Sequence, residues 1–183
     1  MANTFEVIST TTVGSGGTAS ISFTSIPQTY TDLVLYYSLR SNNTSAGSGL
    51  FESVVTRINS SSTTSNYYAI ILRGAGQGGV DSVTYQGSVS WFFPGHYVNG
   101  ANNTANCFSN SQMYFSNYAS SNEKLVSLDS VFESNSATLS VQANYGAGRY
   151  QPTTAITSIS LAPEYGTAWV QYSTATLYGI KNS

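Results

Sequence analysis

The sequence has few charges, and this scarcity excludes one class of partner. Lys, Arg, Asp and Glu together make up 8% of the 183 residues, whereas an ordinary soluble domain contains about 25%. The six Lys and Arg residues are scattered along the chain, and the formal net charge is −2. Binding to a phosphate backbone depends on clustered cations that release counterions, so we expect no nucleic-acid partner.

Cysteine and histidine each occur once, as Cys107 and His96. A lone cysteine cannot form an intrachain disulfide, and one cysteine with one histidine does not supply the ligands of a usual zinc site. The sequence therefore predicts neither a disulfide framework nor a metal centre, and we expect no cofactor.

Long apolar runs are also missing. No stretch approaches 18 consecutive apolar residues, and the N-terminal segment "MANTFEVIST" has no basic region followed by an apolar one. These absences predict that the protein does not insert into a membrane and is not exported by a signal peptide.

What the chain does contain is a series of alternating apolar and polar residues, punctuated by turn residues at short intervals. This pattern is typical of antiparallel strands, and no segment reads as a substantial helix. We predict an all-β fold, a two-sheet β-sandwich of jelly-roll type with about ten strands. The expected strands are at residues 4–10, 19–26, 31–41, 50–59, 67–73, 82–93 (one or two short strands), 107–118, 124–134, 137–145, 155–163 and 168–182.

Residues 1–183 are long enough for one domain with a sizeable core and contain no linker or fixed-period repeat. We therefore expect a single β-sandwich domain, in which residues 1–12 act as an N-terminal arm or an edge strand. The apolar stretch 67–72, "YYAIIL", is interpreted in two ways: a central strand covered on both faces, or a strand whose outer face meets a partner.

The segment "RGAGQGG", residues 73–79, contains the spacing G-x-G-x-x-G of dinucleotide-binding turns. That spacing works where a strand leads into a helix, with an acidic residue about 20 positions further on. The following residues are rich in β-branched and aromatic types, and the next carboxylate after Asp81 is Glu123. We interpret the segment as a loop between two strands.

The residues offer no arrangement for catalysis. His96 is the one candidate general base, and no G-x-S-x-G segment supplies a nucleophile beside it. Asp129 and Glu133 form the densest acidic pair, but four residues of strand separate them by about 13 Å, beyond the spacing that glycosidases use. We predict that the protein is not an enzyme.

With catalysis not expected, binding to other molecules is the function left to consider, because tyrosine, serine, glycine and asparagine make adaptable binding faces. The segment "SWFFPGHYV" (residues 90–98) is the densest aromatic stretch. An alternative is that Trp91 and Phe93 fill the core while Phe92 faces outward. The residues expected to make contacts are Tyr67, Tyr68, Gly76, Gln77, Trp91, Phe92, His96 and Tyr97.

Three stretches that span the chain carry a family resemblance: residues 10–41, 114–131 and 155–183, in which "SIPQTYTDLVL" and "TATLYGIK" are the most specific motifs. They resemble a family of small virion structural proteins of tailed bacteriophages, common among phages of cyanobacteria and other aquatic bacteria. Residues 74–105 depart from the pattern of that family.

The resemblance implies a β-sandwich on the surface of a virion that is assembled in the host cytoplasm. Its first expectation is a capsid decoration, or cement, protein that binds the major capsid protein or other virion proteins; the alternative is a tail or head-fibre adhesin that binds a host glycan. It also implies a homo-oligomer, with a trimer favoured. The family offers no catalytic residue to transfer to this chain.

Overall fold

A computed structural model describes residues 4–45, 49–75, 79–86, 89–93, 96–133 and 142–181. Its regular structure is almost entirely β, with one turn of 3-10 helix at Thr64–Asn66. The strands are β1 (Phe5–Thr12), β2 (Ile21–Phe23), β3 (Asp32–Ser38), β4 (Phe51–Ile58), β5 (Tyr67–Ala75), β6 (Gly79–Gln86), β7 (Tyr97–Asn99), β8 (Asn110–Ser116), β9 (Lys124–Phe132), β10 (Gln142–Tyr150), β11 (Ile159–Pro163) and β12 (Thr174–Ile180).

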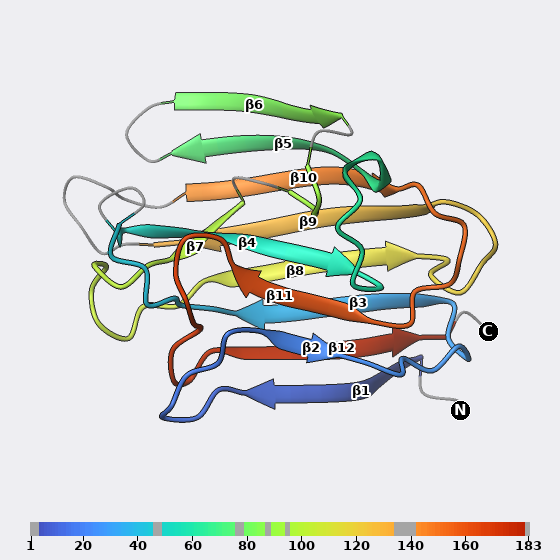
Figure 1. The fold of residues 1–183 in the computed structure, drawn as a ribbon, viewed down its shortest axis with the longest axis horizontal. Helices are drawn as coiled ribbons and strands as arrows, with labels where there is room; N and C mark the ends of the chain where they lie inside the picture. The colour runs from blue at the N-terminus through green and yellow to red at the C-terminus, as the bar shows by residue number, and fades with distance from the viewer. Residues whose placement is uncertain are drawn as a thin grey trace.

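The strands form two antiparallel sheets. The larger has eight strands in the order β1-β12-β3-β8-β9-β10-β5-β6, and the smaller has four in the order β2-β11-β4-β7. In Figure 1 the smaller sheet lies in front of the larger one, and β5 and β6 project past it. In the described ranges, no helix is long and apolar enough to cross a membrane.

The pairing of the strands is that of a jelly roll. β1 pairs with β12, β2 with β11, β3 with β8, and β4 with β7, so early strands meet late strands as in a long hairpin folded over itself. The hairpin β5–β6 is inserted between β4 and β7, and β9–β10 between β8 and β11; both extend the larger sheet. The all-β, two-sheet jelly-roll fold predicted from the sequence is confirmed.

The glycine-rich segment lies where the predicted strand ends. β5 continues to Ala75, and β6 begins at Gly79, which is directly opposite Ala75 in the ladder. The strand therefore returns as a β-hairpin instead of leading into a helix, which removes the structural context that a dinucleotide-binding turn needs. Gly76 and Gln77 lie outside the described residues.

Phe92 and Phe93 cover part of the inner face of the large sheet at β10. Phe92 and Phe93 are fully buried and stack with ring centroids 5.4 Å apart. They lie on Gly148 and Gly146 of β10, where an added Cβ would come within 2.8 Å of the Phe92 ring and 2.7 Å of the Phe93 ring. The glycines of β10 thus provide the space that two phenylalanines fill.

Two expectations about this region are wrong. Residues 89–93 contain no strand, and Phe92 does not face outward, because Phe93 has a φ of 52° and the backbone does not keep the alternation of a strand. The short strand β7, which pairs with β4, lies between the expected strands at residues 82–93 and 107–118, where no strand was predicted. Three residues give too short an alternation to be read from sequence.

Buried cations organise loops instead of pairing with acids. The Arg40 guanidinium donates hydrogen bonds to four backbone carbonyls at 2.8 to 3.2 Å. The acceptors are the carbonyls of Ala101, Asn103, Thr104 and Cys107. One side chain thereby satisfies four carbonyls of a long connection, which fixes the loop that precedes β8.

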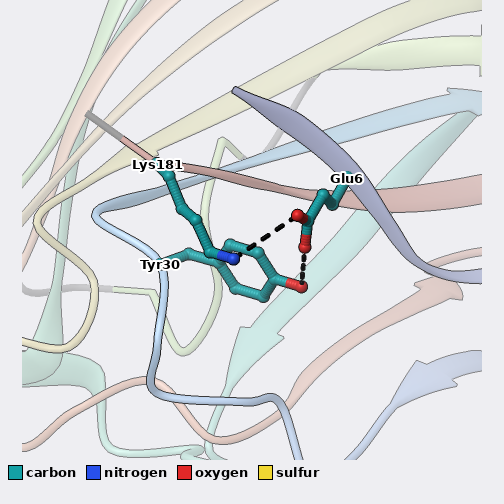
Figure 2. A network of polar contacts seen from close by, with 3 residues as sticks. All are labelled: Glu6, Tyr30 and Lys181. Atoms are coloured by element: carbon teal, nitrogen blue, oxygen red, sulfur yellow. Dashed lines mark hydrogen bonds and ion pairs between the residues drawn. The ribbon is translucent and has the colours of Figure 1, made fainter. Parts of the chain in front are cut away.

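The edge strand β1 is held by the polar contacts shown in Figure 2. Glu6 on β1 accepts a hydrogen bond of 2.9 Å from the Tyr30 hydroxyl and forms an ion pair of 3.4 Å with Lys181. The Tyr30 ring lies against the backbone at Gly179 of β12, where a Cβ would overlap the ring. These contacts join the edge strand to the end of β12 and to the connection before β3.

Candidate binding surface

The outer face of the eight-stranded sheet, turned away from the smaller sheet, carries most of the exposed large apolar side chains. Nine such side chains are exposed in the described residues, and seven of them are on this face. The seven are Phe5, Val7, Tyr36, Ile70, Leu72, Leu125 and Tyr145. Such a concentration on one face is the usual mark of an interaction surface.

Part of this face forms what we call the aliphatic patch: Ile70 and Leu72 of β5, Tyr145 of β10 and Leu125 of β9. Their exposed fractions are 50 to 61%. Leu72 is directly opposite Tyr145, and Ile70 lies two residues away on the same side of β5. The stretch 67–72 therefore alternates: Tyr67, Ala69 and Ile71 enter the core, and Ile70 and Leu72 remain exposed in the chain.

The other half of the face carries an aromatic cluster over β1, β12 and β3. The Tyr178 ring is 5.4 Å from Phe5 and 5.7 Å from Tyr36, the latter at an interplanar angle of 84°. Both distances fall in the range of favourable ring pairs, so these side chains hold one another in place.

The face is nearly free of charge. Among the described residues whose strand positions point outward, three are charged: Asp32, which is buried and accepts a hydrogen bond of 2.6 Å from the Tyr114 hydroxyl, Asp129 and Arg149. Arg149 forms an ion pair of 3.1 Å with Glu123, and its guanidinium lies 4.4 Å from the centre of the Tyr68 ring. A partner of this face consequently loses little hydration of ions on binding, and the association is governed by apolar and neutral polar contacts.

A hollow of about 160 Å³ opens on this face beside the end of the β3–β8 ladder. It is lined by Tyr36, Tyr37 and Ser38 of β3, Asn110 and Ser111 of β8, and Thr174 and Thr176 of β12. None of these side chains is charged, and the five at outward strand positions (Tyr36, Ser38, Asn110, Thr174 and Thr176) each have a hydroxyl or an amide group. The hollow can therefore hydrogen-bond a neutral polar molecule.

Below the hollow, a polar row crosses the buried face of the large sheet. Tyr37, Ser111, Ser130 and Asn144 are directly opposite one another on β3, β8, β9 and β10. The Ser111 and Ser130 hydroxyls are 2.8 Å apart, and His96 Nε2 lies 3.2 Å from Ser130 Oγ and 3.3 Å from the Tyr37 hydroxyl. The row links the floor of the hollow to the one histidine.

His96 is a structural side chain in this arrangement. It is fully buried, and burial lowers the pKa of its imidazole from 6.5 to about 3. The ring is therefore neutral at pH 7. The hydrogen-bond partners of its Nε2 atom are the hydroxyls of Tyr37 and Ser130, and neither partner is a carboxylate. A catalytic base needs a pKa near the working pH and access to substrate, and His96 has neither.

The predicted contact residues divide into two groups. Tyr67, Phe92 and His96 have no exposed surface, because they form the aromatic and polar core between the sheets, so they do not present a contact surface in this conformation. Tyr68, Trp91 and Tyr97 are partly exposed. Tyr68 stacks under Arg149, whereas Trp91 and Tyr97 pack near Arg57 and Phe51.

Tyr36, Leu125 and Tyr145 were not among the residues predicted to make contacts. Each occupies the outward position of an alternating strand, and that signal was present in the sequence. What the sequence did not supply is the adjacency of β9, β10 and β5, which puts Leu72 opposite Tyr145 and brings Leu125 to the same face of the neighbouring strand.

In the described parts of the chain, no group of three or more His, Cys, Asp or Glu side chains is placed to hold a metal ion. Compared with known proteins, the chain matches no family model, no curated protein and no solved structure.

Proposed function

We propose that this chain is a non-enzymatic structural protein of a virus particle, a capsid decoration protein that attaches through the aliphatic patch. The observation that supports this function best is the patch itself: three aliphatic side chains and a tyrosine, each at least half exposed, on adjoining strands, with Asp129 opposite Tyr145 and Arg149 opposite Leu125 as the neighbouring charges. Solvent-exposed aliphatic side chains gathered in one place favour burial against another protein.

The size of the surface agrees with attachment in several copies. Three strands spaced by about 4.8 Å, each extending over about seven residues of 3.3 Å rise, give roughly 300 Å². A standard interface buries about 800 Å² on each partner, so one patch alone supports only weak binding. A trimer presents three such patches to a lattice, and linked sites bind far more tightly than one.

The virion assignment draws on the resemblance of the motifs "SIPQTYTDLVL" and "TATLYGIK" to small phage structural proteins. The jelly-roll fold agrees with the β-sandwich that this resemblance implies. The partner that we propose is the major capsid protein or another protein of the particle surface, and the self-association that we propose is trimeric.

Copy number tests the proposal directly. Particles purified from a lysate that contains this chain are analysed by quantitative mass spectrometry and by antibody labelling in electron micrographs. A copy number that matches the capsid lattice, with label over the head, supports decoration. A copy number that matches the tail or a fibre, with label there, replaces it with the adhesin, and absence of the chain from purified particles overturns the virion assignment.

A binding assay tests the patch. The recombinant protein is added to particles that lack it, and the bound fraction is measured after sedimentation. We expect the double variant Leu72→Ser/Tyr145→Ser to lose most of its binding, because both side chains are exposed and contribute contact area but little to folding. Tyr172→Ser is the matched control, since Tyr172 is 63% exposed in a loop outside the large sheet. Equal binding by the double variant and the wild type would contradict the assignment of the patch.

A further inference from the structure

We infer that the hollow over β12, β3 and β8 binds a single neutral sugar ring. This inference goes beyond particle attachment and does not depend on it, because the hollow lies on the other half of the sheet. Two strand spacings, about 10 Å, separate β8, which lines the hollow, from β10, which carries Tyr145 of the aliphatic patch.

The lining of the hollow matches the chemistry of a sugar. Sugar hydroxyls donate and accept hydrogen bonds, and the five lining residues at outward strand positions offer tyrosine, serine and threonine hydroxyls and one amide, all of which do the same. Outward positions on three strands contribute Tyr36, Ser38, Asn110, Thr174 and Thr176. An apolar ligand would leave these groups without partners, so a polyhydroxylated molecule fits best.

Tyr36 adds the second element of sugar recognition, an aromatic surface for the C–H groups of the ring. Its side chain is 41% exposed at the wall of the hollow, and the perpendicular contact with Tyr178 holds it in place. A ring that is already fixed loses little conformational freedom when a ligand packs on it.

The dimensions limit the ligand to one ring. A volume of about 160 Å³ corresponds to about five water molecules at liquid density. This is space for one monosaccharide unit. Because the hollow opens to solvent, the ring can be the terminal unit of a longer glycan.

Charge decides which sugars are excluded. No lining residue is charged, and along the row Thr176, Tyr36, Gln112, Asp129 the first charged residue is an acid. Without a cation in the lining, the carboxylate of an acidic sugar loses hydration and gains no ion pair. Neutral sugars are therefore favoured over acidic ones.

The floor of the hollow provides a specific reporter. Tyr37 and Ser111 are buried and line the hollow, and their side chains belong to the hydrogen-bonded row that contains His96. A ligand on this floor changes the surroundings of that row. The His96 ring signals are then expected to shift, and a molecule that binds the aliphatic patch does not produce that change.

The experiment is a titration of the isotope-labelled full chain, followed by NMR, with glucose, galactose, mannose and N-acetylglucosamine. Glucuronic acid serves as the charged counterpart of glucose. We expect at least one neutral sugar to shift the amide signals of residues 36–38, 110–111 and 174–176 together with the His96 ring signals. Glucuronic acid is expected to bind at least several-fold more weakly than glucose-like ligands of the same ring size.

Two variants and two controls make the test specific. Tyr36→Ala is expected to weaken binding by roughly tenfold through loss of the aromatic contact, and Thr174→Val by several-fold through loss of one hydroxyl. The controls are Tyr145→Ala, an exposed tyrosine of the same face outside the hollow, and Thr12→Val, which changes the residue directly opposite Thr174. Both controls are expected to bind as the wild type does.

Three results would overturn the inference: no shift with any neutral sugar, binding of glucuronic acid as tight as that of the tightest-binding neutral sugar, or equal losses in Tyr36→Ala and Tyr145→Ala. Thr174→Val is close in shape to the wild type, so it keeps the test decisive if Tyr36→Ala fails to fold. The particle-binding assay with Leu72→Ser/Tyr145→Ser is separate, and its failure leaves the sugar site unaffected.

Discussion

The Glu52 carboxylate of β4 accepts a hydrogen bond of 2.7 Å from the backbone N–H of Gly166, in the loop that follows β11. The same carboxylate accepts from the N–H groups of Glu164 and Tyr165 at 3.0 and 2.9 Å, and Glu52 is fully buried. A Cβ at position 166 would lie 2.9 Å from Glu52 Oε2. Three N–H dipoles thus surround one buried negative charge, and only glycine allows this approach.

Replacing this carboxylate tests its role in stability. We expect Glu52→Gln to lower the free energy of unfolding by about 2–3 kcal/mol, because an amide NH₂ group would face backbone N–H donors that then lack an acceptor. Urea denaturation at pH 7 measures the change. Glu133→Gln is the matched control, since Glu133 is exposed, and it should leave the midpoint unchanged. Equal effects of the two variants would show that Glu52 has no special role.

The close approach of Phe92 to Gly148 gives a second prediction. Gly148→Ala should lower the free energy of unfolding by about 1–3 kcal/mol, because the new methyl group overlaps the Phe92 ring. Gly74→Ala, in the neighbouring strand β5, is the control because nothing lies within 4 Å of its added Cβ. Thermal unfolding distinguishes them, and Phe92→Leu should partly rescue Gly148→Ala. Similar midpoints for the two alanine variants would contradict this packing.

The sequence was sufficient for the fold class because alternation survives in most strands. In the expected strand 31–41, Leu33, Leu35 and Tyr37 occupy alternate positions, and all three are buried. The alternation does not reveal which strands become neighbours, since partners such as β1 and β12 are separated by most of the chain. The jelly-roll form was inferred from the number and style of the strands, and the extension by β5–β6 and β9–β10 was not predicted.

The candidate binding surface could not be predicted from the sequence for a related reason. The dense aromatic segment at residues 90–98 attracted the prediction, yet Phe92 and His96 are used in the core. The hollow is lined by residues of three strands whose sequence numbers range from 36 to 176. No local pattern contains that juxtaposition, so it follows only from the strand order.

The buried histidine predicts an acid-dependent loss of stability. Its pKa is about 3 in the folded chain and near 6.5 when exposed, so the unfolded chain binds the proton more tightly between these values. Stability is therefore fully present above about pH 6.5 and declines as the pH falls toward 3, by up to about 1.4 kcal/mol per pH unit from this group. Urea denaturation at pH 7, 6, 5 and 4 measures the decline.

The histidine contribution is isolated by comparison with His96→Gln, which keeps a polar side chain but does not titrate. Near pH 4, carboxylates contribute to the pH dependence of stability in both the wild type and the variant. The difference between the slopes of the two proteins therefore reports the histidine contribution. The variant should be the less stable protein at pH 7 and lose less stability between pH 6.5 and 5. Parallel slopes over that interval would contradict the burial of a neutral imidazole.

The edge strand gives the last prediction. The hydrogen bond from Tyr30, and then that from Lys181, lower the pKa of Glu6 from its usual 4.5. A lowered carboxyl pKa stabilises the fold above the unfolded value, and the contribution is lost as the pH falls through the folded value, below 4.5.

Neutralising Glu6 at pH 7 should therefore loosen β1 as acid does. We expect Glu6→Gln to speed amide hydrogen exchange in β1 and at the paired end of β12, because these contacts join the strand to its neighbours. The strands β8 and β9 should exchange as in the wild type. Glu123→Gln, which breaks the other surface ion pair with Arg149, serves as the control and should leave β1 unchanged; faster exchange throughout the sheet in Glu6→Gln would instead indicate global destabilisation and contradict a local role at the edge.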